Sequence, residues 1–173
     1  MKSTATHLVV MGVAGSGKST LAESLSHRLD WPMAEADEFH PAANIAKMNS
    51  GTPLDDDDRW PWLHAIREWI TVQASEGNST VLTCSALKHS YRDLLAEADG
   101  NVVFLHLDGR KELLHDRIGS RKGHFMPPTL LPSQLATLEP LTSSELSKGS
   151  LRLDISKSPE ELVEEVVTVL HLA

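Results

Sequence analysis

The most constraining feature of this chain is the octapeptide Gly12-Val13-Ala14-Gly15-Ser16-Gly17-Lys18-Ser19, which fits the pattern G-x-x-x-x-G-K-[ST]. An apolar run at 7–11 before it is typical of a short strand, and leucines recur at helical spacing after it. In a loop between a strand and a helix, glycines let backbone N–H groups surround phosphate oxygens, and the helix dipole favours negative charge. The stretch therefore predicts a nucleoside triphosphate site, with Lys18 on the β- and γ-phosphates and Ser19 on Mg²⁺.

Length and composition exclude several other classes of protein. At 173 residues the chain is long enough to bury a sizeable core, and we expect one domain over residues 1–173. The formal net charge of -8, without a basic stripe, argues against a nucleic-acid-binding surface. No apolar run approaches the ~20 residues of a membrane span, and the N-terminus lacks signal-peptide features. Cys84 is the single cysteine, so no internal disulfide can form and we expect a cytoplasmic protein.

Strand-like and helical patterns alternate along the chain. The strand-like runs are residues 7–11, 33–36, 79–84, 101–108 and 151–155. This alternation predicts a three-layer α/β fold, in which a five-stranded parallel sheet carries helices on both faces. Ligands of such sheets bind outside the carboxyl ends of the strands, so the octapeptide should lie centrally at that edge. The nine histidines lack zinc-type spacing, so we expect no structural metal.

Acidic residues follow the second predicted strand and precede a helix. Asp37 could take part in chemistry at the sheet edge, or it could equally be a cap or turn residue. Residues 55–58 are aspartates before an amphipathic pattern with apolar Trp62, Ala65, Ile66, Trp69 and Ile70. Helix capping explains this acidic run better than a metal site. Arg59 does not fit that explanation, because a cation at a helix start opposes the dipole, and it suggests a group that holds an anionic substrate.

Cations also follow the third predicted strand. Lys88 and Arg92 lie four residues apart on a predicted helix, beside an apolar stripe that includes Tyr91. Near the carboxyl end of a strand they could bind a carboxylate, although a solvated face is the usual explanation for an isolated pair. Cys84 lacks a clear histidine partner, so a small buried residue explains it better than a nucleophile. Asp108 ends the fourth predicted strand, where it could either support a metal or cap the next helix.

The segment from 117 to 125 is rich in arginine, lysine and glycine. Arg117 and Arg121 favour a mobile basic lid, about 117–140, that closes over a transferring phosphate. A basic helix C-terminus is the alternative explanation. A last helix should start at Ser158, because proline follows in the first turn and Glu161 has the capping-box position. Its expected buried residues are Leu162, Val163, Val166, Val167 and Leu170.

Further motifs resemble the gluconokinase family, in order from residue 7 to about residue 170. They lie at residues 11–19, 37–41, 44–48, 51–59, 62–63, 84–88, 91–93, 123–126, 130–131 and 133–134. The combination of D-x-F-H-P, D-D-D-R and G-H-F-M is specific, whereas many proteins share the octapeptide pattern. Glu35 departs from the family, in which aspartate is common, and the longer carboxylate could change how Mg²⁺ or its waters are held.

The resemblance implies ATP-dependent phosphorylation of the terminal 6-hydroxyl of D-gluconate, giving 6-phospho-D-gluconate and ADP. It also implies Mg²⁺ as cofactor, the fold of the nucleoside-monophosphate and shikimate kinases, a closing lid and a homodimer. The chain lacks the N-K-x-D sequence that is expected of a guanine-specific GTPase, which agrees with a small kinase. A kinase for shikimate or a related sugar acid is the nearest alternative. A regulatory ATP-binding module is the alternative from another class.

The same resemblance implies roles for individual residues. Arg59, Lys88 and Arg92 would bind the substrate, with His40, Tyr91 and His124 as helpers, and Asp37 would orient or deprotonate the attacking hydroxyl. Lys18 and the lid residue Arg121 would stabilise charge on the transferring group. The expected nucleotide contacts are Gly12, Val13, Ala14, Gly15, Ser16, Gly17, Lys18, Ser19, Thr20 and Arg117. Residues 154–157, after the last strand, are the candidate adenine contact.

Overall fold

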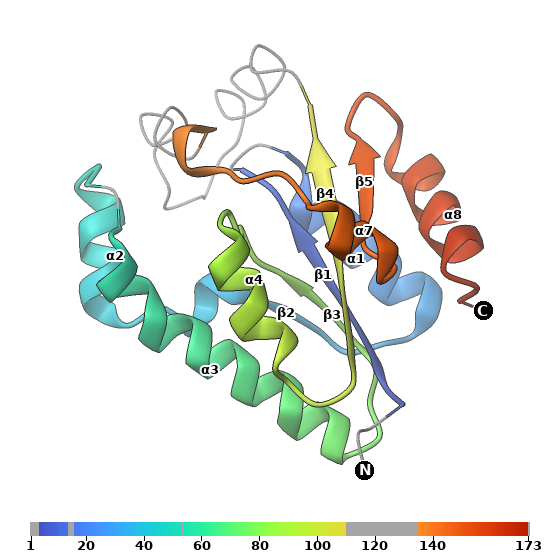
Figure 1. Ribbon diagram of the computed structural model, residues 1–173, viewed down its shortest axis with the longest axis horizontal. Helices are drawn as coiled ribbons and strands as arrows, with labels where there is room; N and C mark the ends of the chain where they lie inside the picture. Colours follow the sequence, from blue (N-terminus) through green and yellow to red (C-terminus); the bar gives the residue numbers. More distant parts are fainter. Residues whose placement is uncertain (1–3, 14–15, 53, 110–134, 173) are drawn as a thin grey trace.

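An all-parallel five-stranded sheet in the order β2-β3-β1-β4-β5 runs through the centre of the computed structural model (Figure 1). The structure describes residues 4–13, 16–52, 54–109 and 135–172. The strands are β1 (Thr6–Met11), β2 (Met33–Glu35), β3 (Thr80–Thr83), β4 (Asn101–Asp108) and β5 (Leu151–Asp154). The predicted sheet is confirmed, and its central strand is the one that leads into the octapeptide.

β1 is central because its side chains are apolar on both faces. Val9 is fully buried and pairs with Leu82 of β3 on one side and with Phe104 of β4 on the other. A parallel strand covered on both faces reads as a continuous apolar run rather than an alternating one, as residues 8–11 do. The octapeptide therefore starts at the middle of the carboxyl edge, as expected.

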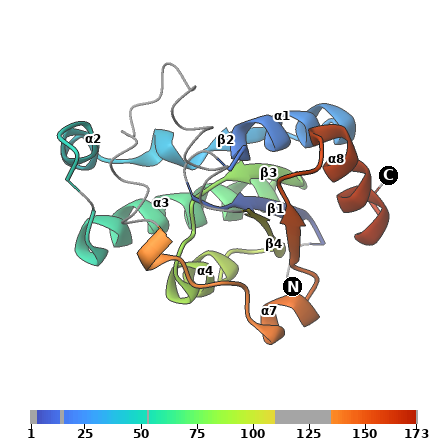
Figure 2. The same cartoon turned by 90° about the horizontal axis from the view of Figure 1, so that it is seen from above.

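Helices cover the sheet on both faces and make three layers (Figure 2). α1 (Lys18–Leu29) and α8 (Pro159–Val169) pack side by side on one face. α3 (Asp56–Ser75) and α4 (His89–Ala96) pack together on the other face. Each face has its own buried apolar cluster. The cluster on the first face includes Leu21 of α1 and Val166 of α8. The cluster on the second face includes Leu63 of α3 and Leu95 of α4. The predicted three-layer α/β fold is thus confirmed.

Short elements connect the sheet edge to α3 and β5. η1 (Ala36–Phe39) is a 3-10 helix, and α2 (Ala42–Asn49) follows it. The second strand therefore ends at Glu35 rather than at Ala36, and Asp37 lies in the turn of helix directly after it. α7 (Ser143–Ser147) precedes β5 and was not predicted, because it has no buried residue and so no apolar periodicity.

The start of α3 explains its acidic run. The Asp55 side chain accepts a hydrogen bond from the Asp58 backbone N–H, and the Asp58 side chain accepts one from the Asp55 N–H. This capping box confirms that the aspartates stabilise the helix start. The predicted apolar face is partly wrong: Ala65 is exposed, and Leu63 is buried instead. The capping box expected at Ser158 of α8 is confirmed.

Among the described helices, none is both long enough and apolar enough to cross a membrane. The part of the expected lid at 117–134 lies outside the described residues. Its last expected residues, 135–140, pack beside α4, where the Glu139 N–H donates to the Leu87 carbonyl at 2.7 Å.

Candidate active site

The phosphate-binding loop is shaped by two glycines that no other residue could replace without strain. Gly12 has a φ of +148°, and a Cβ there would lie 2.9 Å from the Leu107 carbonyl oxygen and 2.8 Å from Ser16 Oγ. Gly17, the N-cap of α1, has a left-handed φ of 96°. The loop backbone therefore passes close to β4 before it turns into the helix whose positive dipole end faces the sheet edge.

Two side chains of this loop have geometry suited to phosphate. Lys18 Nζ donates to the carbonyls of Gly12 and Val13, at 3.1 Å each, so the ammonium lies over the loop. Ser16 Oγ is buried and has no hydrogen-bond partner among the described residues. A buried hydroxyl without a partner inside a cradle of backbone is a group that a phosphate oxygen would satisfy. Ser19, in the first turn of α1, has the hydroxyl that suits Mg²⁺.

Asp37 lies at the sheet edge, beside residues of η1 and α2. Its carboxylate lies 3.9 Å from His40 Nε2. The buried Asn44 side chain contacts His40 Nδ1 at 3.2 Å and donates to the Asp58 carbonyl at 2.8 Å. The amide donates to Nδ1, so the neutral ring carries its proton on Nε2, the nitrogen that faces Asp37. His40 therefore lies beside Asp37 and, through Asn44, ties η1 to the start of α3.

Burial keeps the His40 ring neutral. The ring stacks on Trp62, with centroids 4.2 Å apart, and its side chain is only 3% exposed. Burial, and then the positive charge of Arg59, lower the pKa of His40 from 6.5 to about 4. Trp62 is buried, as its place on the predicted apolar face implies, and its indole N–H donates to the Ala36 carbonyl at 2.7 Å.

Cys84 directly follows β3, close enough to Asp37 and Lys18 for both charges to act on its pKa. Its thiol is buried, and burial is the main cause that raises the pKa of Cys84 to about 12. The Ala86 backbone and the Lys18 charge lower this pKa, whereas the Asp37 charge raises it. Because both charges act on this thiol, the end of β3 brings the Asp37 carboxylate and the Lys18 ammonium into one neighbourhood. The thiol itself is a buried packing group, as expected, since a thiol with so high a pKa is not a nucleophile.

A cluster of Arg59, Lys88, Tyr91 and Asp56 forms where α3 meets the start of α4. Arg59 Nη1 donates to the Tyr91 hydroxyl at 3.0 Å, and that hydroxyl donates to Asp56 Oδ1. Lys88 Nζ lies 3.0 and 3.2 Å from the two Asp56 carboxylate oxygens. Both cations also lie over the Tyr91 ring, at 5.5 and 5.6 Å from its centroid. Three residues expected to bind substrate are thus brought together by one phenol ring.

The charges in this cluster stabilise one another. Hydrogen bonds from Tyr91 and then Lys88 lower the pKa of the Asp56 carboxyl. The Asp56 hydrogen bond raises the pKa of Lys88, so the ammonium stays charged. Both side chains remain partly exposed, at 46% for Asp56 and 31% for Lys88. Solvent and a ligand can therefore still reach the cations.

The expectation that Arg92 binds the substrate does not match its geometry. Arg92 is 1% exposed, and its Nε donates to Glu145 Oε2 at 2.6 Å. Its Nη1 donates to the Ala86 carbonyl at 2.9 Å, and its Nη2 to Glu145 Oε1 at 3.1 Å. Arg92 does bind a carboxylate, as its spacing from Lys88 suggested, but that carboxylate belongs to α7. The reason is tertiary, since the chain at 135–147 covers the helix face that was expected to be open.

Glu35, the departure from the family pattern, is used within the sheet. It pairs in register with Thr83 of β3, and the Thr83 hydroxyl donates to Glu35 Oε2 at 2.5 Å. The longer side chain thus bonds across the strand pair at the edge where the octapeptide lies. Asp108, at the end of β4, lies 3.8 Å from Arg152 Nε.

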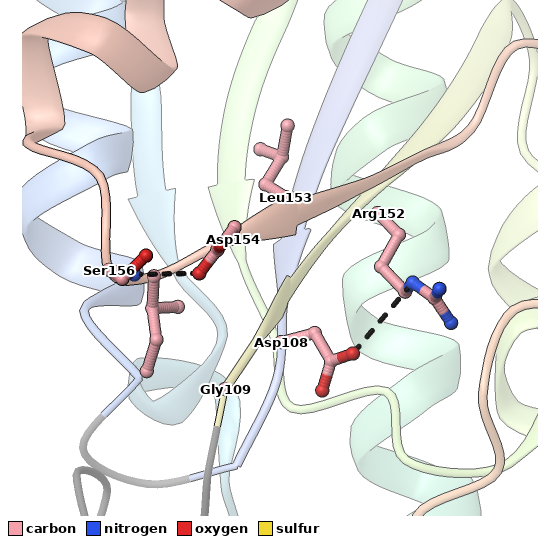
Figure 3. Close-up of a pocket in the computed structure, with 7 residues that line it drawn as sticks. Asp108, Gly109, Arg152, Leu153, Asp154 and Ser156 are labelled. Carbon is pink, nitrogen blue, oxygen red and sulfur yellow. Dashed lines mark hydrogen bonds and ion pairs between the residues drawn. The ribbon is translucent and has the colours of Figure 1, made fainter.

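A cavity of about 700 Å³ opens beside this edge, between the ends of β4 and β5 (Figure 3). Its lining includes Asp108, Gly109 and the candidate adenine contacts Asp154, Ile155 and Ser156. The Ser156 N–H donates to Asp154 Oδ1 at 2.9 Å, which shapes the loop after β5. A Cβ at Gly109 would overlap the Ile155 side chain, so the two loops approach each other closely here.

Sequence patterns did not identify Asp56, Asn44 or Glu145 as site residues. Asp56 was explained as part of a cap, yet Asp55 and Asp58 form the capping box and leave the Asp56 carboxylate to Lys88. Its spacing of three from Arg59 was the available signal. Thr20, a predicted nucleotide contact, is exposed in the first turn of α1. The candidates Ala14, Gly15, Arg117, Arg121 and His124 lie outside the described residues.

We expect the His40 ring to titrate near pH 4 in the folded protein. In the unfolded chain it takes up a proton near pH 6.5, so the unfolded state binds more protons between these values and stability falls as pH drops through them. NMR of the ring protons measures the midpoint, and His40→Gln identifies the resonance by its loss. A folded-state midpoint near 6.5 would contradict the buried neutral ring.

Known proteins resemble this chain over most of its length. A family model described as an AAA domain matches residues 8–141. A gluconokinase of Gluconobacter oxydans (strain 621H) is 48% identical over 160 residues, which cover 92% of this chain and 88% of that protein. A sugar kinase from Janibacter sp. HTCC2649, solved unliganded, superimposes with a TM-score of 0.91 at 50% identity, covering 98% of this chain and 96% of that chain.

A gluconokinase structure from Sinorhizobium meliloti 1021 has a TM-score of 0.82 at 42% identity, covering 99% of this chain and 94% of that chain. Coverage this complete takes in the phosphate-binding loop, the segment around Asp37 and the Arg59–Lys88–Tyr91–Asp56 cluster. Together with the parallel sheet that carries the phosphate-binding loop, these likenesses identify the chain as a member of the gluconokinase family.

Proposed function

We propose that this protein is an ATP-dependent gluconokinase, which transfers the γ-phosphate of ATP to the 6-hydroxyl of D-gluconate and yields 6-phospho-D-gluconate and ADP. The observation that carries the proposal is that one sheet edge holds both a phosphate-binding loop and Asp37, with a cation cluster at the adjoining start of α3. Membership of the family supports the choice of substrate.

The substrate has one carboxylate and a chain of hydroxyls, and the cluster has chemistry for both. Arg59 and Lys88 supply the charge that a single carboxylate needs. The Asp56 carboxylate can accept hydrogen bonds from sugar hydroxyls, and the Tyr91 hydroxyl can accept or donate them. Arg92 is not included among these contacts, because its guanidinium bonds to Glu145 and Ala86.

Phosphoryl transfer needs mainly position and charge neutralisation. Asp37 would accept a hydrogen bond from the attacking hydroxyl, with the neutral His40 ring 3.9 Å away. Lys18 would stabilise the negative charge that develops on the transferring phosphate. Mg²⁺ would be held by Ser19, and when bound it would supply positive charge to the phosphates. The partnerless Ser16 hydroxyl in the described part of the loop fits a phosphate oxygen as well.

The cavity at the end of β5 suits the nucleotide base. β5 lies two strands from β1, which is about 10 Å across the sheet. Asp154, Ser156 and the Gly109 backbone would provide hydrogen-bonding groups around an adenine. In the same proposal Arg117 and Arg121 act on the phosphates, His124 acts on the substrate, and the protein works as a cytoplasmic homodimer.

The direct test is release of ADP from ATP and Mg²⁺ with D-gluconate, beside shikimate, idonate and a control without acceptor. We expect turnover that depends on gluconate and that disappears when EDTA removes Mg²⁺. Turnover on another acid alone would overturn the assignment of D-gluconate as the substrate. ATP binding without turnover on any acid would favour a regulatory module.

Replacing Asp37 should affect chemistry more than binding. We expect Asp37→Asn to lower kcat by roughly tenfold to hundredfold, because the hydroxyl loses its negatively charged acceptor, while gluconate KM changes little. Steady-state kinetics measure both constants. Glu38→Gln, an exposed neighbour in η1, is the matched control and should behave as wild type. An unchanged kcat in Asp37→Asn would remove this carboxylate from the mechanism.

Replacing Arg59 should instead affect binding of the acid. We expect Arg59→Ala to raise gluconate KM by about tenfold to hundredfold, the effect of one charged hydrogen bond, with a small change in ATP KM. Arg67→Ala removes an arginine further along α3, which pairs with Glu97 at 3.5 Å, and serves as control. Equal changes in both KM values would mean that Arg59 supports the helix and not the substrate.

A further inference from the structure

We propose that Glu145 is a positioning residue for the sugar-acid site: through Arg92 it holds residues 86–91 so that Lys88 and Tyr91 face Arg59 and Asp56. Glu145 contacts neither the cluster nor the phosphate-binding loop in the described contacts, so it would act only through other residues. The inference rests on the proposed function, since it takes that cluster as the substrate site.

The first observation is the strain in the segment that carries Lys88. Ala86 has a left-handed φ of 45°, a conformation that a non-glycine residue adopts only when its surroundings require it. The turn at Ala86 sends Leu87 into the core and leaves Lys88 half-buried at the start of α4. The segment would relax if nothing held it, and Lys88 and Tyr91 would move with it.

The second observation is what holds that segment. Arg92 Nη1 donates to the carbonyl of Ala86 itself, at 2.9 Å. The Glu139 N–H donates to the Leu87 carbonyl at 2.7 Å, and the His89 N–H donates to Glu139 Oε1 at 2.8 Å. The residues on both sides of Lys88 are therefore bonded to the chain at 139–145, or to Arg92, which that chain holds.

The third observation is how completely Glu145 is engaged. Its carboxylate accepts from Arg92 at 2.6 and 3.1 Å and from the Thr142 N–H at 3.0 Å, and it lies 3.2 Å from His89 Nδ1. Burial alone would raise the pKa of Glu145, but the Arg92 and Thr142 bonds lower it to about 2, so the carboxylate stays charged. A charged, bidentate and nearly buried pair fixes the orientation of a guanidinium more firmly than a single bond does.

Arg92 in turn depends on Glu145. A buried guanidinium without its carboxylate is strongly disfavoured and would move towards solvent. It would then release the Ala86 carbonyl. The Tyr91 ring, which is next to Arg92 in the chain and against which Trp60 packs edge-on at 5.6 Å, would lose its fixed place beside Arg59.

The test compares KM values for the two substrates in Glu145→Gln, which keeps the shape and removes the charge. We expect gluconate KM to rise about tenfold or more, because small misplacements of binding groups are costly, while ATP KM stays within about twofold. Glu97→Gln, which removes the exposed ion pair between the end of α4 and Arg67, is the matched control and should leave both values near wild type.

A second set of variants separates positioning from general stability. In Arg92→Lys combined with Glu145→Gln, the rise in gluconate KM should be no larger than in the stronger single variant, because both act through one contact. If Glu145→Gln does not fold, the positioning role is tested with Thr142→Ala instead. This variant removes only the hydrogen bond of 3.1 Å that the Glu145 N–H donates to the Thr142 hydroxyl. It should raise gluconate KM in the same direction by a smaller factor.

Hydrogen exchange tests the same contact without any substrate. Amides of residues 86–91 should exchange faster in Glu145→Gln, while those of Ile66 and Ile70 in α3 stay as in wild type. If the wild-type protein does not phosphorylate gluconate, the proposed function is wrong. The positioning role is then tested by the hydrogen exchange of residues 86–91 alone. Unchanged exchange at 86–91, an unchanged gluconate KM, or equal rises in both KM values would overturn the inference.

Discussion

The hydrogen bonding of β1 between β3 and β4 is the constraint on which the rest of this molecule depends. It places the phosphate-binding loop where the chain leaves β1, with the end of β3 on one side and the end of β4 on the other. The Gly12 N–H donates to the Ser85 carbonyl, and the Leu107 carbonyl leaves no space for a side chain at Gly12. The parallel pairing therefore assembles the site from segments far apart in the sequence.

In the proposed function, Asp56 and Tyr91 hold the cations Arg59 and Lys88 in place for an anionic substrate. Arg59 and Lys88 would repel each other at close range, and Asp56 and the Tyr91 phenol lie between them. Such a cluster keeps its geometry before a ligand arrives, so less ordering is needed on binding. The same carboxylate that stabilises the cluster also limits its net positive charge, which suits a substrate with a single carboxylate.

Two cations four residues apart on one helix have different environments here. Lys88 stays partly exposed beside Asp56, whereas Arg92 is buried against Glu145 and the Ala86 carbonyl. Arginine suits the buried position because its planar fork makes several directed bonds at once, which a lysine cannot do. In the proposed function, Lys88 therefore faces the substrate, whereas Arg92 supports the turn at Ala86.

The sequence by itself determined the features that depend on local chemistry. These are the phosphate-binding loop with its flanking strand and helix, the five strands, and the caps of α3 and α8. It also selected Asp37, Arg59, Lys88 and Tyr91 through motifs. Only the tertiary structure decided that Asp56 joins the cation cluster and that Arg92 binds Glu145 instead of facing the site. These pairs are 32 and 53 residues apart, so no local pattern of period or charge could relate them.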